Sequence, residues 1–371
     1  MRQWIKQLFA SSEKIGDTPN NAMTAGTVRQ SLDQAGESAK YKALGDRHLH
    51  SGDFATAAHC YRQAIALDPD NTKALASLGF ALKEQGLFDD AIQIATRALA
   101  IDSTIVDAQY LMGIVSQATG KPDAALTYFR KTLELDPNFE IVYRDLCFLL
   151  FQLGRLEEAR QIAIQGTAQI PNSVDLHFYL GNLYHAERQF DLAIISFEQA
   201  LLIQPQRAEI LANLGLALLA KGDPAQAVIA LQKALALNPN LIDARFNLGS
   251  ALQTQNKTAE AIACYRAVLE NNPQHIAAQN NLGSALRTIG NLNEALICYD
   301  HILANDPDSA EAYCNAGIVL TDLRRFDDAM SNLRRALDIK PDFVEAHSNL
   351  GTVLLALGQV DHDASLVRAD R

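Results

Sequence analysis

Hydrophobic residues recur along most of this chain at the three- and four-residue spacing of an amphipathic helix. The stretch 208–241 shows the pattern, because Leu211, Leu214 and Leu218 fall on one face of a first predicted helix. Gly222 can end this helix, since glycine readily adopts the left-handed conformation that often follows a helix end. The stretch is therefore predicted to begin with a helix and to turn at Gly222.

A second helix is predicted directly after the turn. Asp223 can cap its first turn, and Pro224 suits its first helical position. Ala227 and Leu231 lie on the face that packs against the first helix. Pro239 then ends the second helix and leads into the next stretch. Each stretch of this kind is thus predicted to form two helices joined by a short turn.

This two-helix pattern repeats every 34 residues, without insertion or deletion, in nine full units. A glycine marks the first helix at Gly45, Gly79, Gly113, Gly181, Gly215, Gly249, Gly283, Gly317 and Gly351, and Cys147 interrupts the series. Alanine lies twelve residues after each of the first nine of these ten positions, Cys147 included, at Ala57, Ala91, Ala125, Ala159, Ala193, Ala227, Ala261, Ala295 and Ala329. A strict period of this length predicts a stack of helix pairs, because no single pair can bury its apolar faces alone.

The repeat divides the chain into three regions. Residues 1–37 are predicted to be a flexible leader with a short amphipathic N-terminal segment. Nine repeats fill residues 38–343, and positions within a repeat are numbered 1–34 below. Residues 344–371 are predicted to form a truncated tenth unit and an irregular C-terminal tail, because Asp363 occupies the alanine position. We hypothesise that this tail is a truncated or frame-altered end of a longer chain.

The repeated residues resemble the tetratricopeptide repeat (TPR) family. The first repeat matches the family pattern at Tyr41, Leu44, Gly45, Ala57, Tyr61, Ala64 and Pro69. The resemblance implies an all-α fold, a right-handed α-solenoid of TPR helix-turn-helix repeats whose first helices line a concave groove. Cys147 and Gly166 depart from the pattern in one repeat, where a small local change of packing is expected.

Composition narrows the range of functions. The net charge of -11 argues against a nucleic-acid partner. The five cysteines form no CxxC motif and are expected to be buried side chains in a reducing compartment. No metal site, cofactor or catalytic constellation is predicted. No apolar run is long enough to cross a membrane, so a cytoplasmic protein without an integral membrane segment is expected.

Asparagine recurs at position 6 of the later repeats. The five residues are Asn213, Asn247, Asn281, Asn315 and Asn349. An amide offers both a donor and an acceptor, which suits a peptide main chain in the groove. The motifs ANLG at 212–215 and NNLG at 280–283 resemble the TPR superhelix of O-linked N-acetylglucosamine transferases, which implies a backbone-binding ladder. An equal alternative is that asparagine is simply common at this position.

Other groove positions suggest further contacts. Apolar side chains could form a patch from Phe80, Tyr110, Ile114, Phe148, Phe151 and Phe178, or they could fold into the adjacent core. Acidic residues recur at position 2 as Asp107, Asp175, Glu209, Asp243, Glu311 and Glu345, where the helix dipole favours an anion. A chaperone-type carboxylate clamp is not predicted, because Phe178, Asp243 and Asn247 stand where that clamp requires cations.

We therefore predict a non-catalytic scaffold that binds an extended peptide or an amphipathic helix of another protein. A first alternative is the substrate-recognition arm of a protein glycosyltransferase whose catalytic domain is not in this sequence. A second is an assembly factor docked to a membrane complex, because Trp4, Ile5 and Phe9 share an apolar arc that could contact a membrane surface peripherally through residues 1–9. The sequence does not predict a homo-oligomeric state.

Overall fold

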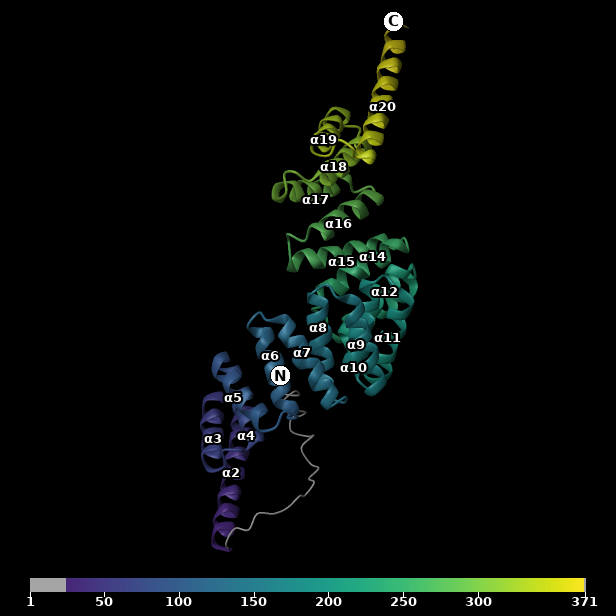
Figure 1. Cartoon of the computed structure of the whole chain (residues 1–371). Helices are drawn as coiled ribbons and strands as arrows, with labels where there is room; N and C mark the ends of the chain where they lie inside the picture. The colour runs from purple at the N-terminus through teal and green to yellow at the C-terminus, as the bar shows by residue number, and fades with distance from the viewer. Residues whose placement is uncertain (1–24, 370–371) are drawn as a thin grey trace. The chain divides into compact units, whose positions relative to one another are not determined.

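The structure is a computed structural model that describes the backbone of residues 25–369 and the side chains of residues 34–358. All regular elements in this part are α-helices (Figure 1). The chain divides into two compact bodies, an N-terminal body ending at Leu183 and a C-terminal body beginning at Tyr184. Each body is a stack of helix pairs, so the predicted all-α solenoid of TPR-type repeats is confirmed.

The helices follow the repeat frame closely. The N-terminal body contains α2 (Ala25–Ser51), α3 (Phe54–Leu67), α4 (Thr72–Glu84), α5 (Phe88–Ile101), α6 (Val106–Ala118), α7 (Pro122–Leu135), α8 (Glu140–Gln152) and α9 (Leu156–Gln169). The boundary between the bodies falls within α10 (Val174–Ala186). The C-terminal body continues with α11 (Phe190–Ile203), α12 (Ala208–Lys221), α13 (Pro224–Leu237), α14 (Ile242–Thr254), α15 (Thr258–Asn271), α16 (Ile276–Thr288), α17 (Leu292–Asn305), α18 (Ala310–Asp322), α19 (Phe326–Ile339) and α20 (Val344–Ala369).

The helix ends carry the predicted capping residues. Asp223 accepts a hydrogen bond from the backbone N–H of Gln226, and Pro224 is the first residue of α13. Gly222 has a φ of 92° at the end of α12, which is the left-handed conformation that glycine tolerates best. These residues set the sharp turn that brings the two helices of a repeat together.

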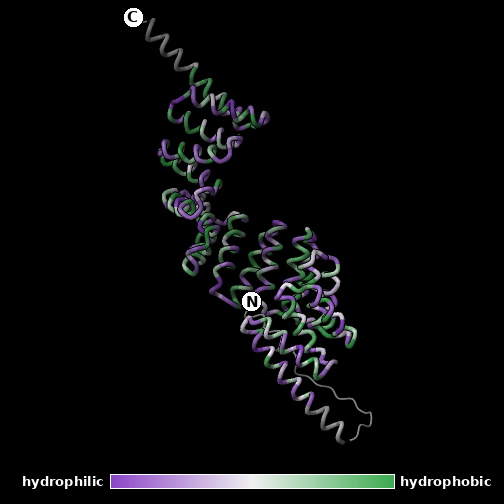
Figure 2. The backbone as a smooth tube through the Cα atoms, turned by 90° about the vertical axis from the view of Figure 1, so that its left-hand side faces the viewer, coloured by the Kyte–Doolittle hydropathy of each residue, from purple (hydrophilic) through white to green (hydrophobic). Residues whose placement is uncertain are grey.

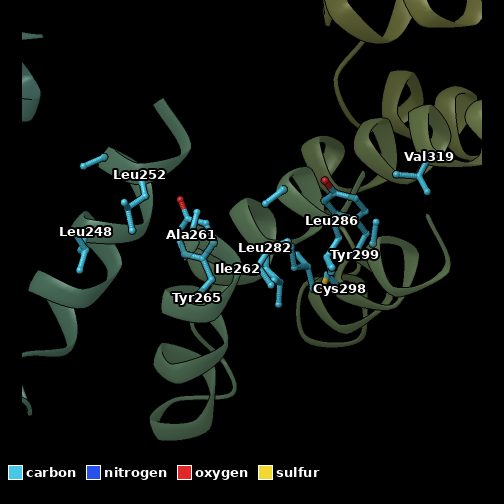
Figure 3. Packing of buried hydrophobic residues seen from close by; sticks show 14 of the residues in the cluster. Leu248, Leu252, Ala261, Ile262, Tyr265, Leu282, Leu286, Cys298, Tyr299 and Val319 are labelled. Atoms are coloured by element: carbon cyan, nitrogen blue, oxygen red, sulfur yellow. The ribbon is translucent and has the colours of Figure 1, made fainter. Parts of the chain in front are cut away.

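Each repeat is held together by an apolar layer between its two helices and the next first helix. In the C-terminal body, Leu248 and Leu252 of α14 pack with Tyr265 of α15 and with Leu282 of α16 in one cluster (Figure 3). Hydrophobic and hydrophilic residues alternate along the helices, as expected for elements buried on one side (Figure 2). The core therefore runs lengthwise through each body rather than around a central point.

The glycine at position 8 is required by a large side chain at position 24 of the same repeat. A Cβ atom on the glycine would lie 2.5 to 2.8 Å from the opposing side chain in the pairs Gly45 and Tyr61, Gly113 and Phe129, Gly215 and Leu231, Gly249 and Tyr265, Gly283 and Tyr299, and Gly317 and Leu333. Real Cβ atoms do not approach other atoms so closely, so any larger residue would force the helices apart.

The exception at Cys147 has a packing explanation. Position 24 of its repeat is Ala163, which is fully buried and much smaller than the usual aromatic or leucine. The space released by this alanine accommodates the Cys147 side chain, whose Sγ lies 3.4 Å from the carbonyl oxygen of Ala159. Gly166 of the same repeat gives room in turn to the Tyr143 ring, which would lie 2.9 Å from an added Cβ. At both departures from the repeat pattern, Cys147 and Gly166, a change in the size of one side chain is thus compensated by the size of its neighbour.

In the repeat of residues 72–105, the side chain that packs against the position-8 glycine comes from the next repeat. Position 24 of residues 72–105 is Ala95, so the nearest atom that the second helix of this repeat places beside a Cβ on Gly79 is the Ala91 carbonyl oxygen, at 3.7 Å. Leu111, at position 6 of the next repeat, reaches across and occupies the place that a side chain on Gly79 would need. Leu111 is completely buried as a result. The leucine at position 6 of residues 106–139 therefore fills the core of the preceding repeat.

The structure corrects the predicted ends of the repeat region. The helix α2 begins at Ala25 instead of Ser38, so residues 25–37 are helical and do not belong to a flexible leader. This stretch contains no proline and several residues of good helix propensity, and it continues the first repeat helix without a break. The segment 1–24, including the predicted amphipathic residues 1–9, lies outside the described residues.

The C-terminal end also differs from the prediction. We expected an irregular tail after Gly358, but α20 continues as one helix to Ala369 (Figure 1). The sequence after Gly358 provides Asp363 where the other repeats place the small alanine of a second helix. Residues 359–369 therefore extend the helix that begins at Val344 instead of forming an irregular tail.

Candidate functional site

The first helices form the inner side of the stack within the C-terminal body. The helices α12, α14, α16, α18 and α20 contact one another in succession, and these contacts are more extensive than any between neighbouring second helices. A stack whose first helices approach more closely than its second helices presents the first helices on its inner side. The predicted asparagines all belong to these five helices.

The asparagine ladder lies on this inner side in a constant register. Its members are Asn213, Asn247, Asn281, Asn315 and Asn349, and each is half-buried. Because they share position 6, they recur once per repeat along the same edge of successive helices. The structure therefore brings the five residues into one row, while their role in binding stays a prediction.

The amide groups of the ladder are only partly used within the protein. The Nδ2 of Asn315 donates to the Oδ1 of Asn280 over 2.8 Å, and the Nδ2 of Asn281 donates to the Tyr265 hydroxyl over 3.4 Å. The Nδ2 of Asn349 donates to the carbonyl oxygen of Glu345 over 2.9 Å. Asn247 makes no hydrogen bond to the described residues. The side-chain oxygens of these four residues accept no hydrogen bond from the same part of the chain and can receive a ligand N–H.

Uncharged polar side chains and a flanking row of carboxylates surround the ladder. Ser250 and Ser284 lie one turn further along α14 and α16, and Asn280 precedes Asn281. At position 2, one turn before the ladder, stand the exposed carboxylates of Glu209, Asp243, Glu311 and Glu345, each in the first turn of its helix. Helix dipoles favour anions there, so these residues need no ligand to explain them. The inner side of the C-terminal body is thus a polar surface rich in amides and hydroxyls.

The predicted apolar patch of the N-terminal body is wrong for two of its members. Phe80 and Tyr110 are 3% and 2% exposed, and their ring centroids lie 6.1 Å apart inside the core. The Tyr110 ring also contacts Phe129 and Phe139. These two side chains fill the space between neighbouring repeats, as the alternative interpretation of the sequence proposed.

The other members remain accessible to different degrees. Phe148 and Phe151 of α8 are 48% and 49% exposed. Ile114 and Phe178 are half-buried, and the Phe178 ring lies 6.0 Å from that of Tyr179. Of the six residues of the predicted patch, the two most accessible are therefore both on α8.

A polar network beside this surface was not predicted from the sequence. The Tyr110 hydroxyl donates to Asp145 over 2.8 Å, and the Arg144 guanidinium donates to the same carboxylate through Nε and Nη2. Nearby, burial raises the pKa of Asp107 to about 6, although Lys42 and Lys73 act in the opposite direction. The signal in the sequence was the adjacent Arg144–Asp145 pair at positions 5 and 6, because no other repeat carries charged residues at both positions.

Metal ligands and cysteine thiols are the next candidate groups within the described residues. No group of three or more His, Cys, Asp or Glu side chains in this part could hold a metal ion. Burial raises the pKa of Cys147 to about 12 and that of Cys314 to about 11, so these thiols stay protonated at neutral pH. None of the helices described here is both long and apolar enough to span a membrane.

Comparison with protein families gives one consistent match. Models of the tetratricopeptide repeat match residues 42–104, 117–180, 174–207, 208–241 and 246–310, and a TPR repeat model matches residues 319–358. Together these matches cover most of the chain and follow the 34-residue frame.

Curated relatives are similar at low identity. BBSome complex member BBS4 of Bos taurus is 25% identical over 193 residues, which is 50% of this chain and 36% of that protein. The probable UDP-N-acetylglucosamine–peptide N-acetylglucosaminyltransferase SPINDLY of Hordeum vulgare is 27% identical over 159 residues, which is 41% of this chain and 17% of that protein. The chain thus spans far less than two thirds of the length of these relatives.

Solved structures share the fold. The APC/C hetero-tetramer Cut9-Hcn1 has a TM-score of 0.51 at 15% identity, covering 85% of this chain and 76% of that one. A tetratricopeptide repeat protein from Parabacteroides merdae has a TM-score of 0.50 at 13% identity, covering 67% of this chain and 98% of that one. The repeat frame, the helix pairs and the family matches agree, and the chain belongs to the tetratricopeptide repeat family.

Proposed function

We propose that this chain is a non-catalytic scaffold that binds an extended segment of another protein along the inner side of its C-terminal body. The supporting observation is the row of position-6 asparagines, four of which, Asn247, Asn281, Asn315 and Asn349, accept no hydrogen bond through the side-chain oxygen from the described residues. Asn247 is the most available member, since neither its oxygen nor its nitrogen is bonded within the described chain. Unengaged amides in one register favour a ligand with regularly spaced N–H and C=O groups, which is a peptide main chain.

The spacing of the row fits an extended peptide. Packed helices lie about 8–10 Å apart, whereas an extended chain advances about 3.3 Å per residue. Successive asparagines of the row would therefore contact every third residue of the peptide. Such a register leaves two peptide side chains between contacts, so we expect recognition to depend more on an extended main chain than on one sequence.

The energetics favour moderate affinity. One hydrogen bond contributes about 0.5–1.5 kcal/mol net, so five provide roughly 3–8 kcal/mol before the cost of ordering the peptide. Ordering costs offset much of this gain, and a dissociation constant in the micromolar range is expected. Stronger binding would need side-chain contacts within the C-terminal body in addition to these hydrogen bonds.

A second candidate function is the recognition arm of a protein glycosyltransferase. The asparagine motifs resemble those of O-linked N-acetylglucosamine transferases, and SPINDLY is among the relatives at 27% identity. Incubating the natural full-length protein with nucleotide sugar and acceptor proteins tests this candidate. Absence of transfer, together with absence of a further domain in the natural protein, would exclude it.

The main proposal is tested with a displayed library of random peptides. The triple variant Asn247→Ala, Asn281→Ala, Asn315→Ala should bind selected peptides roughly 10- to 1,000-fold more weakly, at about 0.5–1.5 kcal/mol per lost bond. Peptides that are methylated on the backbone nitrogen at every third position should lose affinity by a similar factor. Methylation removes the N–H groups that would donate hydrogen bonds to the asparagine side-chain oxygens.

A matched control separates the ladder from asparagine content in general. Asn271 and Asn305 lie on the second helices α15 and α17 and donate to their own helix backbones. Their replacement by alanine should leave peptide binding unchanged. Undiminished capture by the triple variant, or equal loss in the control, would contradict the proposal.

A further inference from the structure

A mostly apolar hollow of about 320 Å³ lies on the C-terminal body between the helices α15, α16 and α17. Its apolar wall includes residues of α16 and α17, namely Leu282, Leu286, Ile297 and Cys298. Leu282, Leu286 and Cys298 also belong to the buried core of this body, which fixes the wall in place (Figure 3). An apolar wall with a few polar groups at this volume is typical of a site for one large side chain or a small molecule.

The hollow lies on the face of α16 that is turned away from the asparagine row. Gln279, Leu282 and Leu286 line the hollow at intervals of three and four residues, so they share one face of the helix. Asn281 follows Gln279 by two residues and is therefore rotated by about 200° around the helix axis. A ligand in the hollow would leave the asparagine row free, so this inference does not rest on the proposed peptide binding.

An arginine at position 26 spans the equivalent place in another repeat. Nη2 of Arg97 donates to the carbonyl oxygen of Pro69 over 2.6 Å. Arg97 and Pro69 stand at the repeat positions that His301 and Pro273 occupy at the hollow. The side chain of His301 is shorter and forms no hydrogen bond or ion pair with the described residues. The opening between His301 and Pro273 is therefore not bridged.

Gln279 places a buried hydrogen-bond acceptor among the lining residues. Its side chain is 6% exposed, and its Nε2 donates to the carbonyl oxygen of Pro273 over 2.7 Å. Because a carbonyl oxygen can only accept, the amide must present its nitrogen to Pro273, and Oε1 is left over. This Oε1 accepts no hydrogen bond from the described residues. A ligand that fills the hollow and excludes water must therefore supply a donor, since an unpaired buried acceptor is costly.

We propose that this hollow binds the indole side chain of a tryptophan on a partner protein. Indole combines a large apolar surface with one N–H group, which donates and does not accept. It therefore matches an apolar wall whose open polar atom is the acceptor Oε1 of Gln279. Leucine or phenylalanine would bury this oxygen without a donor, and the hydroxyl of tyrosine would bring lone pairs that need donors of their own. Tryptophan is also enriched among the side chains that anchor protein interfaces in pockets.

The charges around the hollow favour a neutral ligand. Glu294 is the carboxylate among the lining residues, and its Oε2 lies 2.6 Å from Nη2 of Arg266. A lysine or arginine anchor would therefore find this carboxylate already paired. A single indole group provides only part of a protein interface, so on its own it should bind with a dissociation constant in the millimolar range.

Methyl NMR of the natural full-length protein, labelled at its isoleucine methyl groups, tests the proposal with N-acetyl-tryptophanamide as the probe. The probe should shift the Ile297 methyl signal with a millimolar dissociation constant. The 1-methylindole analogue of this probe is larger and more apolar, but it lacks the N–H group. It should bind about three- to tenfold more weakly, because one hydrogen bond is lost.

The variant Gln279→Leu tests the acceptor. It should bring the two probes to equal affinity, because neither can then donate to an amide oxygen. The variant should fold, since Leu75 and Leu211 are buried at the same repeat position. A preserved preference for the probe with the N–H group would contradict the role of Gln279.

The variant His301→Arg tests the opening of the hollow. Arginine at this position can reach Pro273 as Arg97 reaches Pro69, so the indole probe should bind at least about tenfold more weakly. Gln199→Arg is the matched control, because Gln199 is exposed at position 26 of a different repeat. This control should leave the dissociation constant of the indole probe unchanged.

The triple variant of the ladder asparagines should also bind the indole probe unchanged, so failure of the peptide proposal and failure of this one are distinguishable. Several results would overturn the proposal. They are an unshifted Ile297 signal, equal affinity of the wild type for the two probes, and tighter binding of free tryptophan or of N-acetyl-phenylalaninamide. Full binding by His301→Arg, or an equal loss in Gln199→Arg, would overturn it as well.

Discussion

The replacement of Gly249 by alanine tests the packing rule of the repeat most directly. The added Cβ would lie 2.7 Å from Cε1 of Tyr265, whose side chain is completely buried. The ring cannot slide away without cost, because its hydroxyl donates to the Oε1 of Gln253 over 2.9 Å. Overpacking of this kind costs about 1–3 kcal/mol, and the better helix propensity of alanine returns about 0.5–1 kcal/mol. We expect a net loss of about 1–2 kcal/mol.

The same substitution at Gly351 should have the opposite sign. No atom would contact the new methyl group, so only the propensity gain of about 0.5–1 kcal/mol remains. Hydrogen exchange measured by mass spectrometry suits this comparison, because an array of repeats opens locally and not as one two-state unit. Exchange should accelerate over α14 and α15 in Gly249→Ala and should slow or stay constant over α20 in Gly351→Ala.

A double-mutant cycle identifies the ring as the cause. In a Tyr265→Ala background, Gly249→Ala should no longer destabilise α14 and α15, as the natural pair of Cys147 with Ala163 indicates. The coupling free energy should be at least about 1 kcal/mol. Equal exchange in the Gly249→Ala and Gly351→Ala proteins, or a coupling near zero, would refute the packing argument.

Three further predictions follow from single residues. Arg324 has a φ of 59° in a turn where other repeats carry glycine, so Arg324→Gly should stabilise α18 and α19 by about 1 kcal/mol in hydrogen exchange. Burial raises the pKa of Asp107 from 3.8 to about 6, so the folded state holds this proton more tightly than the unfolded chain. Stability should therefore fall as the pH rises from about 4 to 6, and Asp107→Asn should flatten this dependence in circular-dichroism denaturation. Phe80→Ala should cost about 3–5 kcal/mol in urea denaturation because Phe80 is buried, whereas Phe148→Ala should cost less than about 1 kcal/mol.

The repeat frame predicted the helix pairs and the small residues at their contacts because these depend on local spacing. Gly222, Asp223 and Pro224 have the predicted capping roles, since a cap involves only neighbours in the chain. The same reasoning from neighbouring residues did not predict a positive φ at position 15 in the repeats that lack glycine there. Position 15 adopts positive φ also at Arg188, Asn256 and Arg324, where no glycine signals it.

Accessibility within the groove could not be predicted from one helix at a time. Phe80 and Phe148 both stand at position 9, yet one is 3% and the other 48% exposed. The difference arises from the neighbouring repeat, because Tyr110 covers Phe80. The prediction of an irregular C-terminal tail also failed, because the departure from the repeat pattern at Asp363 did not show that residues 359–369 continue the helix that begins at Val344.

The contact of Leu111 with Gly79 has a consequence for rearranging the array. Residues 72–105 lack a large side chain at position 24 and depend on the leucine of the following repeat to fill their interior. Residues 106–139 therefore cannot be exchanged for another repeat of this chain, most of which carry a small or polar residue at that position, without opening a void beside Ala95. Protein engineers who shorten, permute or graft this scaffold should move the two repeats as one indivisible module.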